Sequence, residues 1–140
     1  MYPRIDEKEE IKMAKTKSTP PATFSIVHDG QLTQEEALSS LRIAAQSATE
    51  ALPKALAICA TDNDRHKVMD DRDTVVLAYQ NSLQKTLIQT GALFEKTASD
   101  LETEAENVRQ KAAALTNVTD AINLLTGLIK LAASLALAFG

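Results

Sequence analysis

The sequence is poor in the residues that build turns, sheets and covalent cross-links. Of its 140 residues only four are glycine, four proline and one cysteine, tryptophan is absent, and aromatic residues make up 4%. Strands favour aromatic and β-branched side chains, so this composition argues against a β-rich fold. The single cysteine, Cys59, excludes a disulfide framework within the chain, and its apolar neighbours predict a buried thiol.

Motifs that carry chemistry are equally scarce. Isolated glycines cannot form a phosphate-binding loop, and the two histidines, His28 and His66, lie far apart in the sequence. An acidic cluster over residues 62–73 lacks the glycine and the terminal glutamate of a calcium loop, so we interpret it as the solvated start of a helix. We therefore expect no enzymatic activity, no catalytic or metal site, no cofactor and no small-molecule substrate.

The charge pattern limits the classes of partner and the route of synthesis. A net charge of −4 leaves no basic excess for a nucleic-acid partner. Residues 1–17 mix charges of both signs and contain no apolar stretch of signal-peptide length. We expect synthesis in the cytoplasm without a cleavable signal peptide. Membrane association or secretion would then follow a signal-independent route.

What the chain does have is alanine and leucine, which supply most of its 44% of hydrophobic residues and have high helix propensity. The sequence therefore predicts an all-α fold. We expect an antiparallel helical bundle or hairpin with one long coiled-coil-like helix, an apolar C-terminal helix and a disordered N-terminal arm.

The chain divides into a flexible N-terminal arm over residues 1–31 and a helical bundle domain over residues 32–140. Thr19-Pro20-Pro21 prevents a helix and favours extended backbone in the arm. The short apolar segment Phe24-Ser25-Ile26-Val27 follows. It could add to a sheet as a strand or dock in a groove, but it is too short to be stable alone.

Capping residues and breakers predict three helices, over residues 33–60, 64–114 and 118–139. The first begins with a capping box from Thr33 to Glu36, and Pro53 is expected to kink or divide it. The second begins at Asn63 or Asp64 and contains Gly91, which implies either a bend or the close approach of another backbone. The third begins after the capping residue Asn117.

The densest packing signal lies in the second half of the long predicted helix. Apolar residues there recur at alternating steps of four and three, with a large side chain and an alanine in turn: Phe94, Ala98, Leu101, Ala105, Val108, Ala112 and Leu115. Such a heptad seam predicts coiled-coil-like pairing with a closely approaching helix. An ordinary amphipathic core face is the alternative.

The last predicted helix is apolar over most of its circumference, and Lys130 is its only charge between residues 121 and 139. Its leucines and isoleucines contribute about −4 to −5 kcal/mol to membrane insertion, which Lys130 and the small polar residues offset almost completely. It is therefore the central helix of a soluble bundle, a helix that lies on or enters a membrane, or an oligomer seam. The residues assigned to an oligomer or membrane contact are Ile122, Leu125, Ile129, Lys130, Ala136 and Phe139.

One local resemblance to a known family is present. Leu77-Ala78-Tyr79-Gln80, with Leu83 and later Phe94-Glu95-Lys96, resembles the second helix of type III secretion needle and inner-rod subunits. The chain departs from those subunits by continuing into the charged heptad seam and the apolar C-terminal helix.

Two hypotheses for function remain. The first is a non-enzymatic structural or interaction protein, a self-associating helical-bundle subunit whose partner is another copy or another helical protein. The second is a membrane-active helical protein, such as a pore-former, a secreted effector or a tail-anchored factor, that uses the apolar C-terminal helix.

Overall fold

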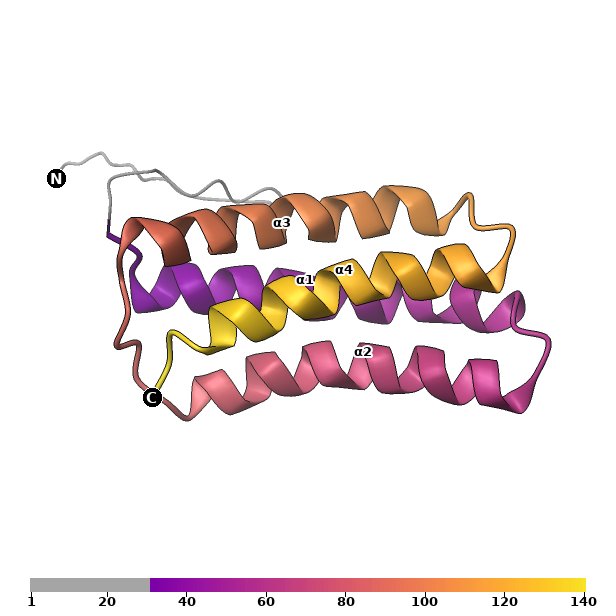
Figure 1. Cartoon of the computed structure of the whole chain (residues 1–140), viewed down its shortest axis with the longest axis horizontal. Coiled ribbons are helices and arrows are strands. Elements are labelled where there is room, and N and C mark those ends of the chain that lie inside the picture. Colours follow the sequence, from indigo (N-terminus) through magenta and orange to yellow (C-terminus); the bar gives the residue numbers. More distant parts are fainter. Residues whose placement is uncertain (1–30) are drawn as a thin grey trace, which may run out of the picture.

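Four helices follow one another up and down along the bundle in the computed structural model, which describes residues 31–140 (Figure 1). They are α1 (Gln34–Ala57), α2 (Asp62–Leu83), α3 (Ala92–Ala112) and α4 (Val118–Ala136). The expected all-α bundle with an apolar C-terminal helix is confirmed. The predicted arm, including Phe24-Ser25-Ile26-Val27, lies outside the described residues except for Gln31.

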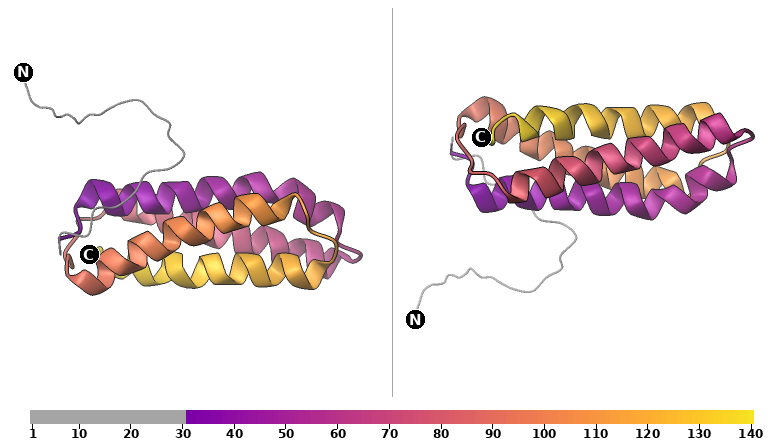
Figure 2. Two further views of the ribbon diagram at one scale, coloured as in Figure 1. Left: turned by 90° about the horizontal axis from the view of Figure 1, so that it is seen from above. Right: turned by 90° about the horizontal axis from the view of Figure 1, so that it is seen from below.

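The helices occupy the corners of a four-helix bundle in which α1 and α4 each pack against both α2 and α3. In the part of the chain that the structure describes, α2 and α3 do not touch, so they are diagonal neighbours (Figure 2). Short loops join the antiparallel pairs α1–α2 and α3–α4. The connection from α2 to α3, residues 84–91, therefore crosses the end of the bundle, and we call it the crossover.

Local capping chemistry fixes three of the helix starts. The Thr33 hydroxyl accepts from the Glu36 backbone N–H at 3.1 Å, while the Thr33 N–H donates to the Glu36 carboxylate at 2.9 Å. Asn117 caps α4 by accepting from the Asp120 N–H at 2.8 Å. Both caps match the sequence expectation. α2 instead begins one or two residues early, at Asp62, because the Thr61 hydroxyl caps it.

The expectation of one continuous helix over residues 64–114 is wrong. The chain leaves the helix after Leu83 and enters α3 at Ala92, with Gly91 as the extended residue before it. A single helix of that length would be roughly 75 Å long, about twice the length of α1, so half of its apolar face would find no partner. Dividing it lets both halves pack in one bundle.

Pro53 does not divide the first helix. α1 is a single helix from Gln34 to Ala57 with Pro53 inside its last turns, and the proline ring lies on the exposed side. The missing proline N–H therefore costs one hydrogen bond close to the helix end. Of the two expected effects of Pro53, a division of the helix is therefore wrong.

Small residues dominate the contact between α1 and α3. α1 presents five fully buried alanines and two buried serines to the interior, namely Ala37, Ala44, Ala48, Ala51, Ala55, Ser40 and Ser47. α3 contributes Ala98, Ala105 and Ala112. The Ser40 hydroxyl donates to Glu102 at 2.9 Å, and further along Arg109 donates to Glu50 at 3.1 Å. Residue numbers rise in the same direction along both helices, so the adjacent helices α1 and α3 run parallel.

Candidate interaction surface

The seam residues of α3 face the interior of the bundle. Ala98, Leu101, Ala105 and Val108 are fully buried, Ala112 and Leu115 are buried, and Phe94 packs half-buried against them. The structure therefore uses this seam for contacts with α1 and α4 of the same chain. A partner molecule would have to contact another part of the surface.

The residues assigned to an oligomer or membrane contact fall into two groups. Leu125 and Phe139 belong to the buried core, so they are not available on the folded surface. Ile122, Ile129 and Ala136 are half-buried, and Lys130 is exposed. The structure therefore brings only the second group to the outside of α4.

Some of the half-buried residues of α4 lie on a line with heptad spacing. Steps of four and three connect Ile122, Thr126, Ile129, Ala133 and Ala136, and we call this line the α4 ridge. Ala133 is exposed and the other four are half-buried. The spacing is the one that lets a helix interlock with a second helix.

α4 carries more apolar residues than the bundle buries. Of the residues in its most apolar stretch, 28% are buried within the chain, while Ile122, Leu124, Ile129 and Leu131 are half-buried. It is long and apolar enough to cross a membrane, a criterion that core helices of soluble proteins also meet. Among residues 31–140 it is the one helix that meets this criterion.

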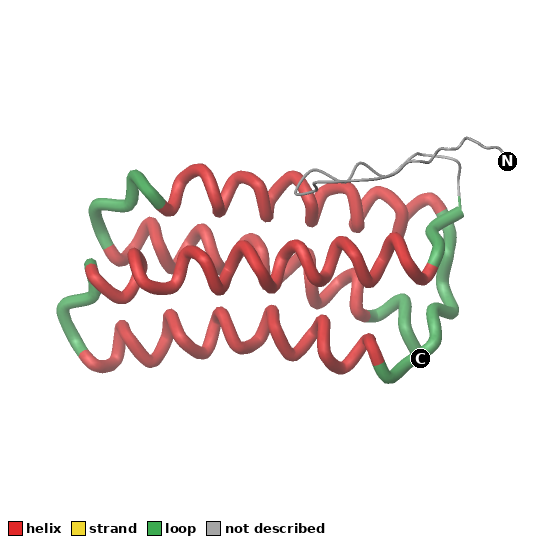
Figure 3. The backbone as a smooth tube through the Cα atoms, turned by 180° about the vertical axis from the view of Figure 1, so that it is seen from behind, coloured by secondary structure: helices red, strands yellow, loops and turns green. Residues whose placement is uncertain are grey.

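A second apolar surface lies at one end of the bundle. Four large apolar side chains are exposed at this end, with exposures of 51% for Leu83, 62% for Ile88, 72% for Leu93 and 74% for Leu137. These residues lie at the end of α2, in the crossover, in the first turn of α3 and just after α4. Figure 3 shows these loop segments at the end where the described chain begins. We call these four residues the end patch.

Backbone hydrogen bonds hold the end patch in place. In the crossover, the N–H of Thr86 donates to Gly140 and that of Ile88 to Ala138, at 3.2 and 2.8 Å. The Gly140 N–H returns a bond to Thr86 at 2.9 Å. A Cβ added at Gly140 would lie 2.7 Å from the Ile88 side chain, so Ile88 packs directly over this glycine. These contacts hold the crossover against the C-terminal residues.

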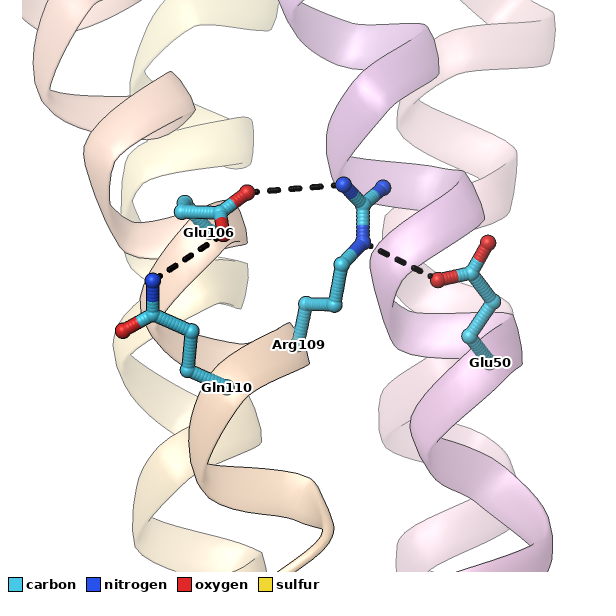
Figure 4. A network of polar contacts seen from close by, with 4 residues as sticks. All are labelled: Glu50, Glu106, Arg109 and Gln110. Atoms are coloured by element: carbon cyan, nitrogen blue, oxygen red, sulfur yellow. Dashed lines mark hydrogen bonds and ion pairs between the residues drawn. The ribbon is translucent and has the colours of Figure 1, made fainter. Parts of the chain in front are cut away.

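A groove of about 1210 Å³ runs over the outer side of α1 between α2 and α3. Two of its polar side chains, Arg109 and Glu50, pair with each other. Arg109 bonds to Glu50 at 3.1 Å and to Glu106 at 3.4 Å, and Gln110 donates to Glu106 at 3.1 Å (Figure 4). This network connects α1 to α3 across the groove.

Two titratable groups in the bundle have shifted pKa values. Burial raises the pKa of the Glu102 carboxyl to about 7, the bond from Ser40 opposes this rise, and the nearby charge of Glu36 adds to it. Burial likewise raises the pKa of the Cys59 thiol, as does the charge of Asp64. The Cys59 thiol donates to the Ala55 carbonyl at 3.2 Å, so the predicted buried cysteine is confirmed.

The acidic cluster of α2 does not converge on one point. Within residues 31–140 no three His, Cys, Asp or Glu side chains lie together as metal ligands could. Asp62 pairs with Arg65 and Asp71 with Lys67, at 2.6 and 2.8 Å. The cluster therefore provides ion pairs along one helix.

Sequence reasoning missed the end patch entirely. Leu83, Ile88 and Leu93 fall inside the continuous helix that the sequence predicted, where their spacing gives no sign that they share a surface. Their meeting depends on the crossover, whose only local signal is Gly91.

Comparisons with known proteins identify no relative. No protein-family model matches the chain, and no curated protein or solved structure matches it significantly.

Proposed function

We propose that the protein is a non-enzymatic subunit that self-associates, or joins a larger helical assembly, through the outer side of α4. The observation that carries this proposal is the line of apolar side chains on the outside of α4, where Ile122, Ile129 and Ala136 are only half-buried. Apolar surface left in contact with water favours association with a partner that removes it.

The α4 ridge supplies the shape that helix pairing needs. Ile122 and Ile129 lie seven residues apart, with the smaller Thr126 and Ala133 between and after them. Large and small residues in this order form knobs and holes for a second helix, in a coiled-coil-like contact. Lys130 lies beside the ridge, and its long aliphatic stem can cover apolar surface while its ammonium group stays in water.

Sedimentation of the intact chain tests self-association directly. We expect a concentration-dependent mass above the 15.1 kDa of one chain in detergent-free buffer. Ala133→Glu should shift the equilibrium towards the monomer, because it places a charge on the exposed part of the ridge. Ser134→Glu adds the same charge one residue further, on the polar side of α4, and should leave the mass unchanged. A monomer at every concentration would refute self-association.

A second candidate, a membrane-active protein, rests on the length and composition of α4. Its 19 residues span about 28 Å, close to the thickness of a bilayer core. Insertion would require the helix to withdraw Leu125 and Leu128 from the core.

Flotation with liposomes separates this candidate from the first. Lys130→Leu removes the charge near the middle of α4 and should increase the floating fraction, whereas Lys111→Leu, an exposed lysine at the end of α3, should not. A chain that stays out of the lipid fraction with both neutral and anionic liposomes would eliminate the membrane candidate.

A further inference from the structure

The α4 ridge keeps its spacing when the helix is reversed. Its midpoint is Ile129, with Ile122 seven residues before it and Ala136 seven residues after it. Thr126 and Ala133 lie three residues before and four residues after the midpoint. Reversing the helix about Ile129 therefore places each ridge residue within one residue of another ridge position. A surface with this property can contact a second copy of itself about a two-fold axis.

The sizes of the side chains favour the antiparallel orientation of such a pair. With Ile129 at the centre, Ile122 of each copy lies opposite Ala136 of the other, so a large side chain meets a small one at both ends. A parallel pair in register would instead set Ile122 against Ile122 and Ala136 against Ala136. The isoleucines would then hold the helices apart, and the alanine layers would remain unfilled. The antiparallel pair fills the space along the ridge more evenly.

The antiparallel pair also uses the whole length of the ridge. From Ile122 to Ala136 the helix rises about 21 Å, and a pair centred on Ile129 overlaps along all of it. Displacing the copies by one heptad would halve this overlap to about 10 Å. Ala133 is exposed and the other ridge residues are half-buried, so each has surface left for the second copy to cover.

Lys130 marks the edge of the contact. It is exposed, follows Ile129 directly and is the only charged residue of α4 after Asp120. In the antiparallel pair both Lys130 side chains lie on the same side, near the two-fold axis. Their long stems reach water, where salt screens the repulsion between the ammonium groups. This repulsion is therefore a modest cost, and it grows at low ionic strength.

We propose that α4 binds α4 of a second copy as an antiparallel pair, about a two-fold axis that passes through Ile129. The inference rests on the proposed self-association and adds its orientation and its register. An isologous contact uses the same surface on both copies and closes at two, so the product is a dimer of two bundles packed side by side.

Disulfide formation between single cysteines measures the orientation. All variants carry Cys59→Ala, so that the added cysteine is the only one in the chain. Thr126→Cys of one copy should link to Ala133→Cys of the other, because the two positions differ by about 1.5 Å along the helix axis in the antiparallel pair. Neither variant should link to itself. Its two copies would lie about 9 Å or 12 Å apart along the axis, beyond the roughly 7 Å that a disulfide spans between Cα atoms.

A mixture of these two variants, with an affinity tag on one, is oxidised mildly and separated by electrophoresis without reductant. The mixed dimer should be the main linked product. Ile129→Cys, at the axis, should link to itself in either orientation and so shows whether the ridges meet. The control Ser134→Cys, on the polar side of α4, should link to none of these positions.

Each other outcome has a distinct meaning. Linkage of Thr126→Cys and of Ala133→Cys each to itself would overturn the inference in favour of a parallel pair, and would leave self-association through α4 intact. No linkage at any ridge position, in chains that sediment as oligomers, would overturn the inference and place the contact on another surface. A chain that sediments as a monomer would overturn both the inference and self-association, so the two failures give different results.

Discussion

Replacing Glu102 with glutamine should stabilise the bundle at alkaline pH and leave its stability in acid unchanged. Burial between α1 and α3 raises the pKa of this carboxyl from an ordinary 4.5 to about 7. The folded state therefore holds the proton more tightly than the unfolded state. Stability contributed by the protonated group is complete below pH 4.5 and falls as pH rises towards 7, where the carboxyl ionises in the folded protein.

The expected gain in stability follows from this difference in the pKa of Glu102 between the folded and unfolded states. A pKa rise of this size corresponds to about 3.4 kcal/mol at pH 8 if it were expressed in full. Glu102 is only half-buried, so solvent screening reduces the expected effect to about 1–2 kcal/mol. Glutamine keeps an acceptor for the Ser40 hydroxyl, which donates at 2.9 Å, and so removes the charge without breaking this contact.

Urea denaturation at pH 4, 6 and 8 measures the effect. The free energy of unfolding of Glu102→Gln should exceed that of the unchanged chain by about 1–2 kcal/mol at pH 8 and equal it at pH 4. Glu104→Gln, two residues along the same helix, is the control for general loss of charge. Equal gains at pH 4 and pH 8 would refute the reasoning, because they could not come from ionisation of Glu102.

Three further predictions concern the core. Ala105→Leu should lower the free energy of unfolding by about 1–3 kcal/mol, because Ala105 is fully buried and a larger side chain forces its neighbours apart. Thermal denaturation measures this effect, and an unchanged melting temperature would contradict it. Asp71→Leu should leave the free energy of unfolding unchanged or raise it by up to about 3 kcal/mol, because Asp71 is buried with one carboxylate oxygen unpaired. Asp70→Leu, at an exposed site, is the control. Cys59 should react with a thiol reagent only as the protein unfolds, and rapid labelling of the native state would disprove its burial.

Local sequence determined the helical class and most helix boundaries. The Thr33–Glu36 capping box and the Asn117 cap act within four residues, so their chemistry is complete in the sequence. The alternation of large residues and alanines from Phe94 to Leu115 likewise identified the face of α3 that the structure buries. These features depend only on local capping chemistry and on helical periodicity.

Tertiary structure decided where the long predicted helix ends and which surfaces remain uncovered. Residues 84–91 contain no proline and a single glycine, so local propensity permits a helix there. Long-range bonds replace it, among them those from Thr86 and Ile88 to residues 138–140. That break separates α2 from α3, places them on opposite corners, and brings Leu83, Ile88, Leu93 and Leu137 to one end. The packing of α4 in the bundle likewise places some of its apolar residues in the core and others on the α4 ridge. The free energy of packing distant segments sets these outcomes, and it is not encoded at any single position.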